Sequence, residues 1–553
     1  MTPMRMLLLS TCLFAGLAQA ANDPPGSEVD AQALSRHVQV LASDAFEGRA
    51  PATPGEQRTV DYLIAQFQAA GVQPGGEDGG WVQTVPLVRA QVTGKASLTL
   101  HQGDSARALA VGTEITAQTL QPVDAVSLSQ VPLVFVGYGI DAPERGWDDY
   151  KGQDLRGKIA VMLINDPDFQ SAGPGVFDGR AVTYYGRWTY KYEEAARRGA
   201  AGVLIVHETE PAAYPWATVQ ASGTSPLFDV QRGHEESMAA HTPLRGWISR
   251  ALAGEVFAAA GLDFEAEKRR AMTPDFVPVP LGDARLSAEL QLQRETVLSR
   301  NVVAKLSGQS HPDEAVVVSA HWDSYGIGQP DAQGRRIRAG AVDNATGVAA
   351  VLEIARVMAA GPRPARSVYF AAFTAEEKGL LGAVHFAAHP PVAPEKLAAV
   401  LNIEMFSPDG ANADISSWGR GRVDLEQSLA EVAAARGRHY TPDPALESGF
   451  FYRADHFAFA RLGVPAITIG AGLDALDGGV SVGQARRQAY FANCYHQPCD
   501  AWSPQWKADG LAADTQLVLD LARRISSSRT WPQWEEGAEF NARRRSSDAA
   551  RQP

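Results

Sequence analysis

The chain has 553 residues, more than a single hydrophobic core usually organises, so two or three domains are expected. Hydrophobic residues make up 45% and charged residues 20%, which is ordinary for a globular protein. The formal net charge of -13 argues against a nucleic-acid partner, because phosphate binding relies on a concentrated basic surface.

The first 20 residues have the three parts of a secretory signal peptide. Arg5 supplies a positive charge, residues 6–17 are largely apolar, and the small-residue box Ala18-Gln19-Ala20 follows. A lipidated Cys12 is a weaker alternative, because threonine is a poor residue before such a cysteine. The apolar run is shorter than the about 20 residues that span a bilayer, and no later run is long enough. We therefore predict cleavage after Ala20, export to the periplasm or the medium, and no integral membrane segment.

Two cysteines then remain, Cys494 and Cys499. In an oxidising compartment, a close pair is more often a disulfide than a metal site. With no second pair elsewhere, two thiolates would also make an incomplete structural zinc site. We therefore predict that these two residues form a disulfide.

The first part of the mature chain, residues 21–123, has apolar residues at helical spacing over 29–41 and 56–70, then strand-like alternation over 96–100. A second unit, residues 124–261, contains strands bounded by turn residues and gathers no catalytic residue types. Its sequence resembles the protease-associated domain, a β-rich insert of several exported peptidases.

Residues 262–530 alternate between strand and helix patterns from about residue 301. The predicted strands are 316–320, 366–374, 398–404 and 464–469, and the predicted helices are 347–359, 377–388 and 511–526. Such alternation predicts an α/β fold with a mostly parallel, mixed sheet and helices on both faces. Residues 531–553 are polar and rich in arginine, which predicts a disordered tail.

Residues of metal-ligand type lie at strand ends and in loops of this unit. His321 follows the first strand, Asp343 precedes a helix, Glu376 and Glu377 follow the second strand, and Glu404 closes the third. A fifth place is His496, between the two cysteines. Each alone has an ordinary interpretation, such as a helix N-cap or a solvated charge. Together, two histidines and three carboxylates suit two zinc ions with one carboxylate bridging them.

These segments resemble the di-zinc exopeptidases that include aminopeptidase Y, bacterial secreted leucyl aminopeptidases and glutamate carboxypeptidase. The motifs are His-x-Asp at 321–323, Gly-Ala-x-Asp-Asn-Ala-Thr-Gly at 340–347, a Glu-Glu pair at 376–377 and Tyr-Arg-x-Asp-His-Phe at 452–457. The match covers about residues 301–522 and extends to residues 41–54.

The resemblance implies two Zn²⁺ ions per chain. Asp343 would bridge them, His321 and Glu404 would complete one site, and Glu377 and His496 the other. The position of Glu404 is more often aspartate in this family, and the extra methylene moves its carboxylate by about 1.5 Å. The resemblance also implies a cis peptide bond between Asp343 and the residue that follows it.

The resemblance assigns the catalytic roles as well. Glu376 would be the general base, and Asp323 would orient the histidine two residues before it. Because neighbours in an extended segment point in opposite directions, Glu376 and Glu377 are expected to do different work. Tyr495 is placed either to hydrogen-bond the reacting oxygen or to serve as a half-buried packing aromatic.

Three further residues come from the last motif. Arg453 resembles a residue that helps to fix substrate termini. Asp455 and His456 resemble residues that contact the metal ligands without binding metal themselves. For all three, a supporting role and substrate contact remain equally open.

The sequence thus predicts an exported zinc aminopeptidase that hydrolyses the N-terminal bond of peptides with a free N-terminus, using a metal-activated water. Alternatives are a carboxypeptidase or glutaminyl cyclase of the same fold, or a non-catalytic, receptor-like relative. The complete ligand set favours a two-zinc hydrolase over a cyclase or a receptor. A carboxypeptidase would need a cationic pocket for the substrate carboxylate, which the sequence does not locate. The sequence gives no prediction of oligomeric state.

Overall fold

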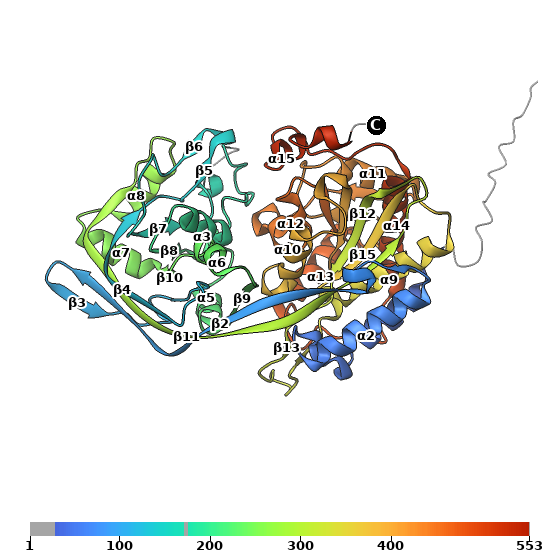
Figure 1. Ribbon diagram of the computed structural model, residues 1–553, viewed down its shortest axis with the longest axis horizontal. Helices are drawn as coiled ribbons and strands as arrows, with labels where there is room; N and C mark the ends of the chain where they lie inside the picture. The colour runs from blue at the N-terminus through green and yellow to red at the C-terminus, as the bar shows by residue number, and fades with distance from the viewer. Residues whose placement is uncertain (1–27, 171–174, 552–553) are drawn as a thin grey trace, which may run out of the picture.

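The computed structural model of the chain describes residues 28–170 and 175–551, so the predicted signal peptide lies outside the described residues. Figure 1 shows two lobes connected by a long two-stranded ribbon. Across the described residues, no helix is both long and apolar enough to cross a lipid bilayer.

The peptidase lobe is built on a mixed sheet with the strand order β11-β15-β12-β16-β19-β17-β18. These strands are Val279–Leu306, Arg366–Phe373, His311–His321, Leu397–Ile403, Ala466–Ala471, Asp414–Ser417 and His439–Thr441. The four central strands β15, β12, β16 and β19 run parallel, whereas β11 and β17 are antiparallel to their inner neighbours. The predicted mostly parallel, mixed α/β sheet is confirmed.

Helices cover both faces of this sheet because successive side chains of a buried strand point to opposite sides. In β12, Val316 and Val318 pack into one core, while Ala315 and Val317 pack into the other. The first core is closed by helices α1, α2, α9, α11 and α14, which span Ala31–Leu41, Pro54–Ala69, Thr346–Ala360, Leu425–Ala435 and Ala508–Ser527. The second is closed by α10, Leu381–Ala388, and α12, His456–Ala460.

The ribbon pairs β11 with β2, Val82–Gln102, in antiparallel register from Val302 opposite Val82 to Arg285 opposite His101. It leads into the second lobe, where β4, β7, β8 and β10 run parallel. They span Ala125–Phe135, Ile159–Leu163, Gly202–His207 and Leu244–Ser249, and α3, Trp188–Arg197, α7, Arg250–Ala259, and α8, Phe264–Ala271, pack around them.

The second lobe, called the insert lobe below, is larger than the unit expected at 124–261. Its core begins at Leu98 and ends at Leu290. The two strands of the ribbon run without a break from one lobe into the other, so no turn signal in the sequence marks the boundary.

The lobes also touch away from the ribbon. The ring of Tyr184 in the insert lobe lies 5.5 Å from that of Phe457 and 6.4 Å from that of Tyr452 in the peptidase lobe. Beside them, Arg461 pairs with Glu193 across the boundary at 3.0 Å. The two lobes are therefore joined at two separate places.

The end of the chain is folded, so the predicted disordered tail was wrong as far as residue 551. Trp534 is only 3% exposed and its indole N–H donates to the carbonyl oxygen of Gly463 at 2.9 Å. Helix α15, Asn541–Arg545, follows, and its buried Arg544 donates to the carbonyl oxygen of Leu397 at 3.1 Å. Two aromatic anchors, Trp534 and Phe540, outweigh the polar composition around them.

Candidate metal centre

The predicted ligand residues meet at the carboxyl edge of the peptidase sheet. His321 is the last residue of β12, and Glu404 directly follows β16. Glu377 lies in the short turn after β15, Asp343 in the turn before α9, and His496 in the loop after α13, Gly479–Asn493. Since the carboxyl ends of parallel strands share one edge, loops far apart in the sequence converge there.

Two groups of metal-ligand atoms result, and they share one carboxylate. In the first group, Nε2 of His321 lies 3.1 Å from Oδ1 of Asp343 and 3.4 Å from Oε2 of Glu404. In the second, Nε2 of His496 lies 3.2 Å from Oδ2 of Asp343 and 3.3 Å from Oε2 of Glu377. Within each group, the ligand atoms all lie within 4.8 Å of one another.

The chemistry of these groups fits bound cations. Burial raises the pKa of Glu377 well above its usual value, and the neighbouring Asp343 adds to the effect. Oε1 of Glu377 and Nε2 of His496 are buried without a hydrogen-bond partner in the described part of the chain. Unpaired buried charge is costly, and a divalent cation would neutralise it. Imidazole and carboxylate ligands are the set that zinc accepts.

The shared carboxylate is held in its charged form. Burial alone would raise the pKa of Asp343, but the interactions of its carboxylate with His321 and His496 outweigh burial and lower it. The peptide bond between Asp343 and Asn344 is cis. The amide of Asn344 donates to Oε2 of Glu404 at 2.8 Å, so the loop also positions the longer glutamate side chain.

Asp323 connects the two groups through the backbone. Its carboxylate accepts the N–H of Glu376 at 2.9 Å and lies 3.4 Å from the N–H of Glu377. Nδ1 of His321 lies 3.1 Å from the backbone oxygen of Asp323 and 3.6 Å from its carboxylate. Asp323 therefore contacts both the turn that carries Glu376 and Glu377 and the side chain of His321.

The two adjacent glutamates do diverge, although not for the expected reason. The segment Glu376–Lys378 is a 3₁₀ turn and not extended. Glu377 faces His496, whereas Oε2 of Glu376 lies 3.9 Å from Nε2 of His321. Burial raises the pKa of Glu376 well above its usual value.

The sequence did not single out Asp500, which fixes the loop of Asp343. Its two carboxylate oxygens accept the backbone N–H groups of Val342 at 2.8 Å and Asp343 at 3.1 Å. The hydroxyl of Tyr490 donates to the same carboxylate at 3.0 Å, and burial raises the pKa of Asp500 to about 7. The sequence feature that could have pointed to Asp500 is its position directly after Cys499.

Arg49 was also missed. Its buried guanidinium donates to the backbone oxygens of Trp322 and Gly340, in the loops that carry the two sites, and to those of Leu41 and Ala339. The residue lies in the segment 41–54, so the opening helices of the chain support the metal centre directly.

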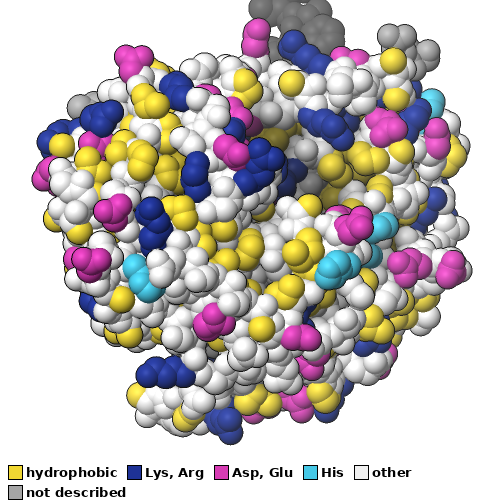
Figure 2. All heavy atoms as spheres, turned by 60° about the vertical axis from the view of Figure 1, so that its left-hand side comes forward, with side chains coloured by type: hydrophobic (Ala, Val, Ile, Leu, Met, Phe, Trp, Pro, Cys, Tyr) yellow, Lys and Arg dark blue, Asp and Glu magenta, His cyan; other side chains and the backbone are white. Residues whose placement is uncertain are grey.

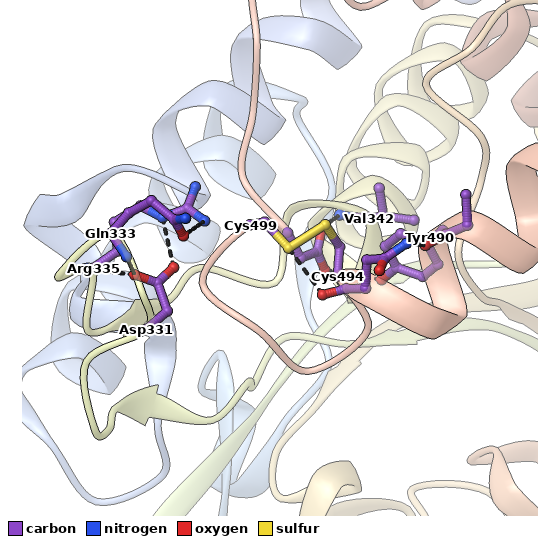
Figure 3. Close-up of a disulfide and its surroundings, with 10 residues drawn as sticks. Asp331, Gln333, Arg335, Val342, Tyr490, Cys494 and Cys499 are labelled. Carbon is purple, nitrogen blue, oxygen red and sulfur yellow. Dashed lines mark hydrogen bonds and ion pairs between the residues drawn. A yellow bond between two sulfur atoms is a disulfide. The ribbon is translucent and has the colours of Figure 1, made fainter.

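The loop of His496 is closed by a disulfide between Cys494 and Cys499, with 5.1 Å between their Cα atoms. Figure 3 shows this disulfide beside Val342 and Tyr490, apart from the hairpin that carries Asp331. The disulfide therefore lies against the same turn that Asp500 holds.

Tyr495 lies over the metal centre. Its ring stacks on that of His496 with centroids 3.6 Å apart, and its hydroxyl accepts from Nη2 of Arg453 at 3.3 Å. The ring of Tyr325, which the sequence did not single out, lies 4.4 Å from that of His496. Two phenol groups are thus close to one ligand.

The two residues expected to support the site differ in their surroundings. Asp455 is fully buried and neither carboxylate oxygen has a hydrogen-bond partner among the described residues. His456 is turned toward Thr468, with Nδ1 2.6 Å from its hydroxyl oxygen. Burial lowers the pKa of His456 to about 3, so it is neutral in the folded protein.

The fold and the site together define a metallopeptidase of the α/β class. Residues 301–520 match the family described as Peptidase family M28, so this part of the chain is similar to that family.

Several other proteins are similar to this chain. A probable zinc metalloprotease of Pyrenophora teres f. teres is 42% identical over 104 residues, which are 19% of this chain and 22% of the relative. An aminopeptidase of Pseudomonas aeruginosa is 26% identical over 490 residues, covering 83% of this chain and 74% of the relative. An aminopeptidase from Aneurinibacillus sp. strain AM-1 has the same fold, with a TM-score of 0.50, 20% identity, and 91% and 95% of the two chains covered.

Proposed function

We propose that the chain is an exported aminopeptidase that binds two zinc ions and releases the N-terminal residue of peptides. The observation that carries the proposal is the pair of ligand groups that share Asp343, with Glu376 beside them. In this assignment His321, Asp343 and Glu404 hold one ion, and Asp343, Glu377 and His496 hold the other.

The reaction needs a proton carrier, and Glu376 is the proposed one. Bound zinc would lower the pKa of a water molecule toward 7 and polarise the scissile carbonyl. Glu376 accepts the proton of the attacking water and returns it to the leaving amine. Asp323 keeps that carboxylate in place through the Glu376 amide. Tyr495 donates a hydrogen bond to the substrate carbonyl oxygen as negative charge develops on it.

Export and the role of the insert lobe are parts of the same proposal. Export is based on the signal peptide predicted for residues 1–20. We assign the insert lobe as a protease-associated domain from its sequence. The lone cysteine pair, joined in a disulfide, agrees with an oxidising compartment.

The test combines metal content with substrate choice. Protein loaded with zinc is expected to bind two ions per chain and to hydrolyse aminoacyl anilides, but not the same anilides after N-acetylation. Full hydrolysis in excess chelator, after metal removal is verified, would refute a metal-dependent reaction. Release of C-terminal residues from N-blocked peptides would instead identify a carboxypeptidase, and cyclisation of an N-terminal glutamine would identify a cyclase.

A further inference from the structure

A cavity of about 1070 Å³ opens between the two lobes, next to the metal centre. Glu377 and Tyr325, which belong to the metal centre or lie against it, are part of its wall. Four arginines also line it: Arg187, Arg245, Arg453 and Arg487. The first two come from the insert lobe and the others from the peptidase lobe. Figure 2, which turns the insert lobe toward the viewer, shows a hollowed surface bordered by Lys and Arg side chains.

These four arginines lack the partners that surface arginines usually have. Among the described residues, none of the four has a carboxylate oxygen within 4.0 Å. The wall includes the carboxylates of Glu377 and Glu447, and Lys378 adds a fifth cation. The cavity is therefore positively charged, although the whole chain has a formal net charge of -13.

Arg187 is the least satisfied of the four. Its Nε is buried without a hydrogen-bond partner in the described residues. Burial, together with the nearby charge of Arg453, lowers the pKa of Arg187 to about 10. Arg187 and Arg453 line the same cavity from different lobes, and two like charges at that range repel unless an anion binds beside them.

Aromatic rings keep the other three cations in place. The guanidinium of Arg245 lies 5.2 Å from the ring of Tyr192, and those of Arg453 and Arg487 lie 4.9 and 5.8 Å from that of Phe450. Such stacking orients a guanidinium without using its N–H donors. Apart from Nη2 of Arg453, which donates to Tyr495, the N–H groups of these three guanidiniums have no hydrogen-bond partner among the described residues and are available to a ligand.

One of the four arginines, Arg453, is separated from the proposed metal ligand His496 by a single side chain, that of Tyr495. Nη2 of Arg453 lies 3.3 Å from the hydroxyl of Tyr495, and the ring of Tyr495 stacks on His496. A group bound by Arg453 and Arg187 would thus belong to the substrate residues nearest the scissile bond.

We propose that the cavity binds a carboxylate on the leaving part of the substrate, and that Arg187 of the insert lobe determines this preference. The inference rests on the proposed aminopeptidase function and narrows its substrate class. The carboxylate comes either from the C-terminus of a di- or tripeptide or from an acidic side chain next to the scissile bond. Paired N–H groups of arginine bind both forms in the same way.

Matched substrates separate the two sources. The zinc-loaded protein is compared on X-Ala and X-Ala-amide, and on X-Glu-amide and X-Gln-amide, where X is the best N-terminal residue for anilide hydrolysis. A hydrogen bond to a charged group is worth about 1.5–3 kcal/mol, so kcat/KM should favour one carboxylate over its neutral match by about 10–100-fold. Preference in the first pair identifies the C-terminus, and preference in the second identifies the side chain.

Variants then assign the preference to Arg187. In Arg187→Gln the ratio within the favoured pair should fall at least about tenfold, mainly through KM, and Arg187→Lys should retain part of it. The matched control is Arg269→Gln, which removes an exposed charge from α8 of the same lobe and should change nothing. Arg245→Gln repeats the test at a second position if Arg187→Gln fails to fold.

Some outcomes would overturn the inference. Anilide hydrolysis without preference in either pair, or equal losses on charged and neutral substrates in Arg187→Gln, would refute the carboxylate site and leave the aminopeptidase proposal intact. If no anilide is hydrolysed, the proposed function fails, and calorimetry with succinate tests the site alone. Wild-type protein should then bind succinate at least about tenfold more tightly than Arg187→Gln, and equal binding would refute the site.

Discussion

Replacing Asp500 by asparagine should weaken zinc binding although the residue is not itself a proposed ligand. Its carboxylate accepts two backbone N–H groups, from Val342 at 2.8 Å and from Asp343 at 3.1 Å. An asparagine has one oxygen for these two donors and turns its NH₂ group toward the other. One charge-assisted hydrogen bond is lost, at about 1.5–3 kcal/mol, and a buried N–H is left unsatisfied.

That loss falls on the turn carrying the carboxylate shared by both ligand groups, so zinc affinity should fall about 10–100-fold, as for other residues that orient ligands. The assay is competition for zinc with a chromophoric chelator. Asp509→Asn, which changes an exposed carboxylate at the start of α14, is the control and should bind zinc normally. If Asp500→Asn folds and keeps wild-type affinity, Asp500 does not position Asp343.

Three other changes have defined outcomes. Glu376→Gln should lower turnover by about 10²–10⁴-fold with zinc retained, whereas Glu377→Gln should lose zinc from one site. Zinc stoichiometry and turnover are measured for both variants. Loss of zinc from Glu376→Gln instead would show that the two roles are reversed. Cys494→Ser leaves Cys499 unpaired and removes about 2 kcal/mol of loop constraint, so zinc affinity should fall. The assay is chelator competition, and an unchanged affinity would show that the disulfide does not help to position His496. His456 has a folded pKa of about 3 against an ordinary 6.5, so the stability gained from keeping it neutral is present above pH 6.5 and is lost as the pH falls toward 3. In urea unfolding, wild type should therefore lose about 2 kcal/mol more than His456→Gln between pH 7.5 and pH 5, and equal losses would contradict the burial of a neutral imidazole.

The sheet was predictable because its strands are buried on both faces. A largely apolar run such as 316–320, with Ser319 as its one polar residue, indicates a core element, and the helices between such runs imply parallel pairing. The extent of the insert lobe was not predictable, since β11 alternates polar and apolar residues from Val279 to Leu306 across both lobes. Composition misled at the C-terminus, where the buried rings of Trp534 and Phe540 matter more than the arginines beside them.

The proposed ligands could be recognised because their residue types carry the chemistry. Arg49 and Asp500 act on backbone atoms, and any residue type can supply those. The bond from Arg49 to the oxygen of Trp322 joins positions 273 residues apart, and nothing in either segment indicates the partner. The same holds for the cavity, where Arg187 and Arg453 approach each other from different lobes.

The two separate junctions between the lobes determine which molecules can reach the metal centre. The hydrogen-bonded ribbon of β2 and β11 joins the lobes at one place, and the contacts of Tyr184 and Glu193 join them at another. Because the lobes are held together at both places, the space between them is closed on two sides and cannot open widely by a hinge motion. A cavity of about 1070 Å³ is at the upper end of small-ligand sites, so it admits a short or extended chain end but not a folded domain. If the proposed peptidase function holds, we expect the architecture to select substrates by size and to exclude intact folded proteins.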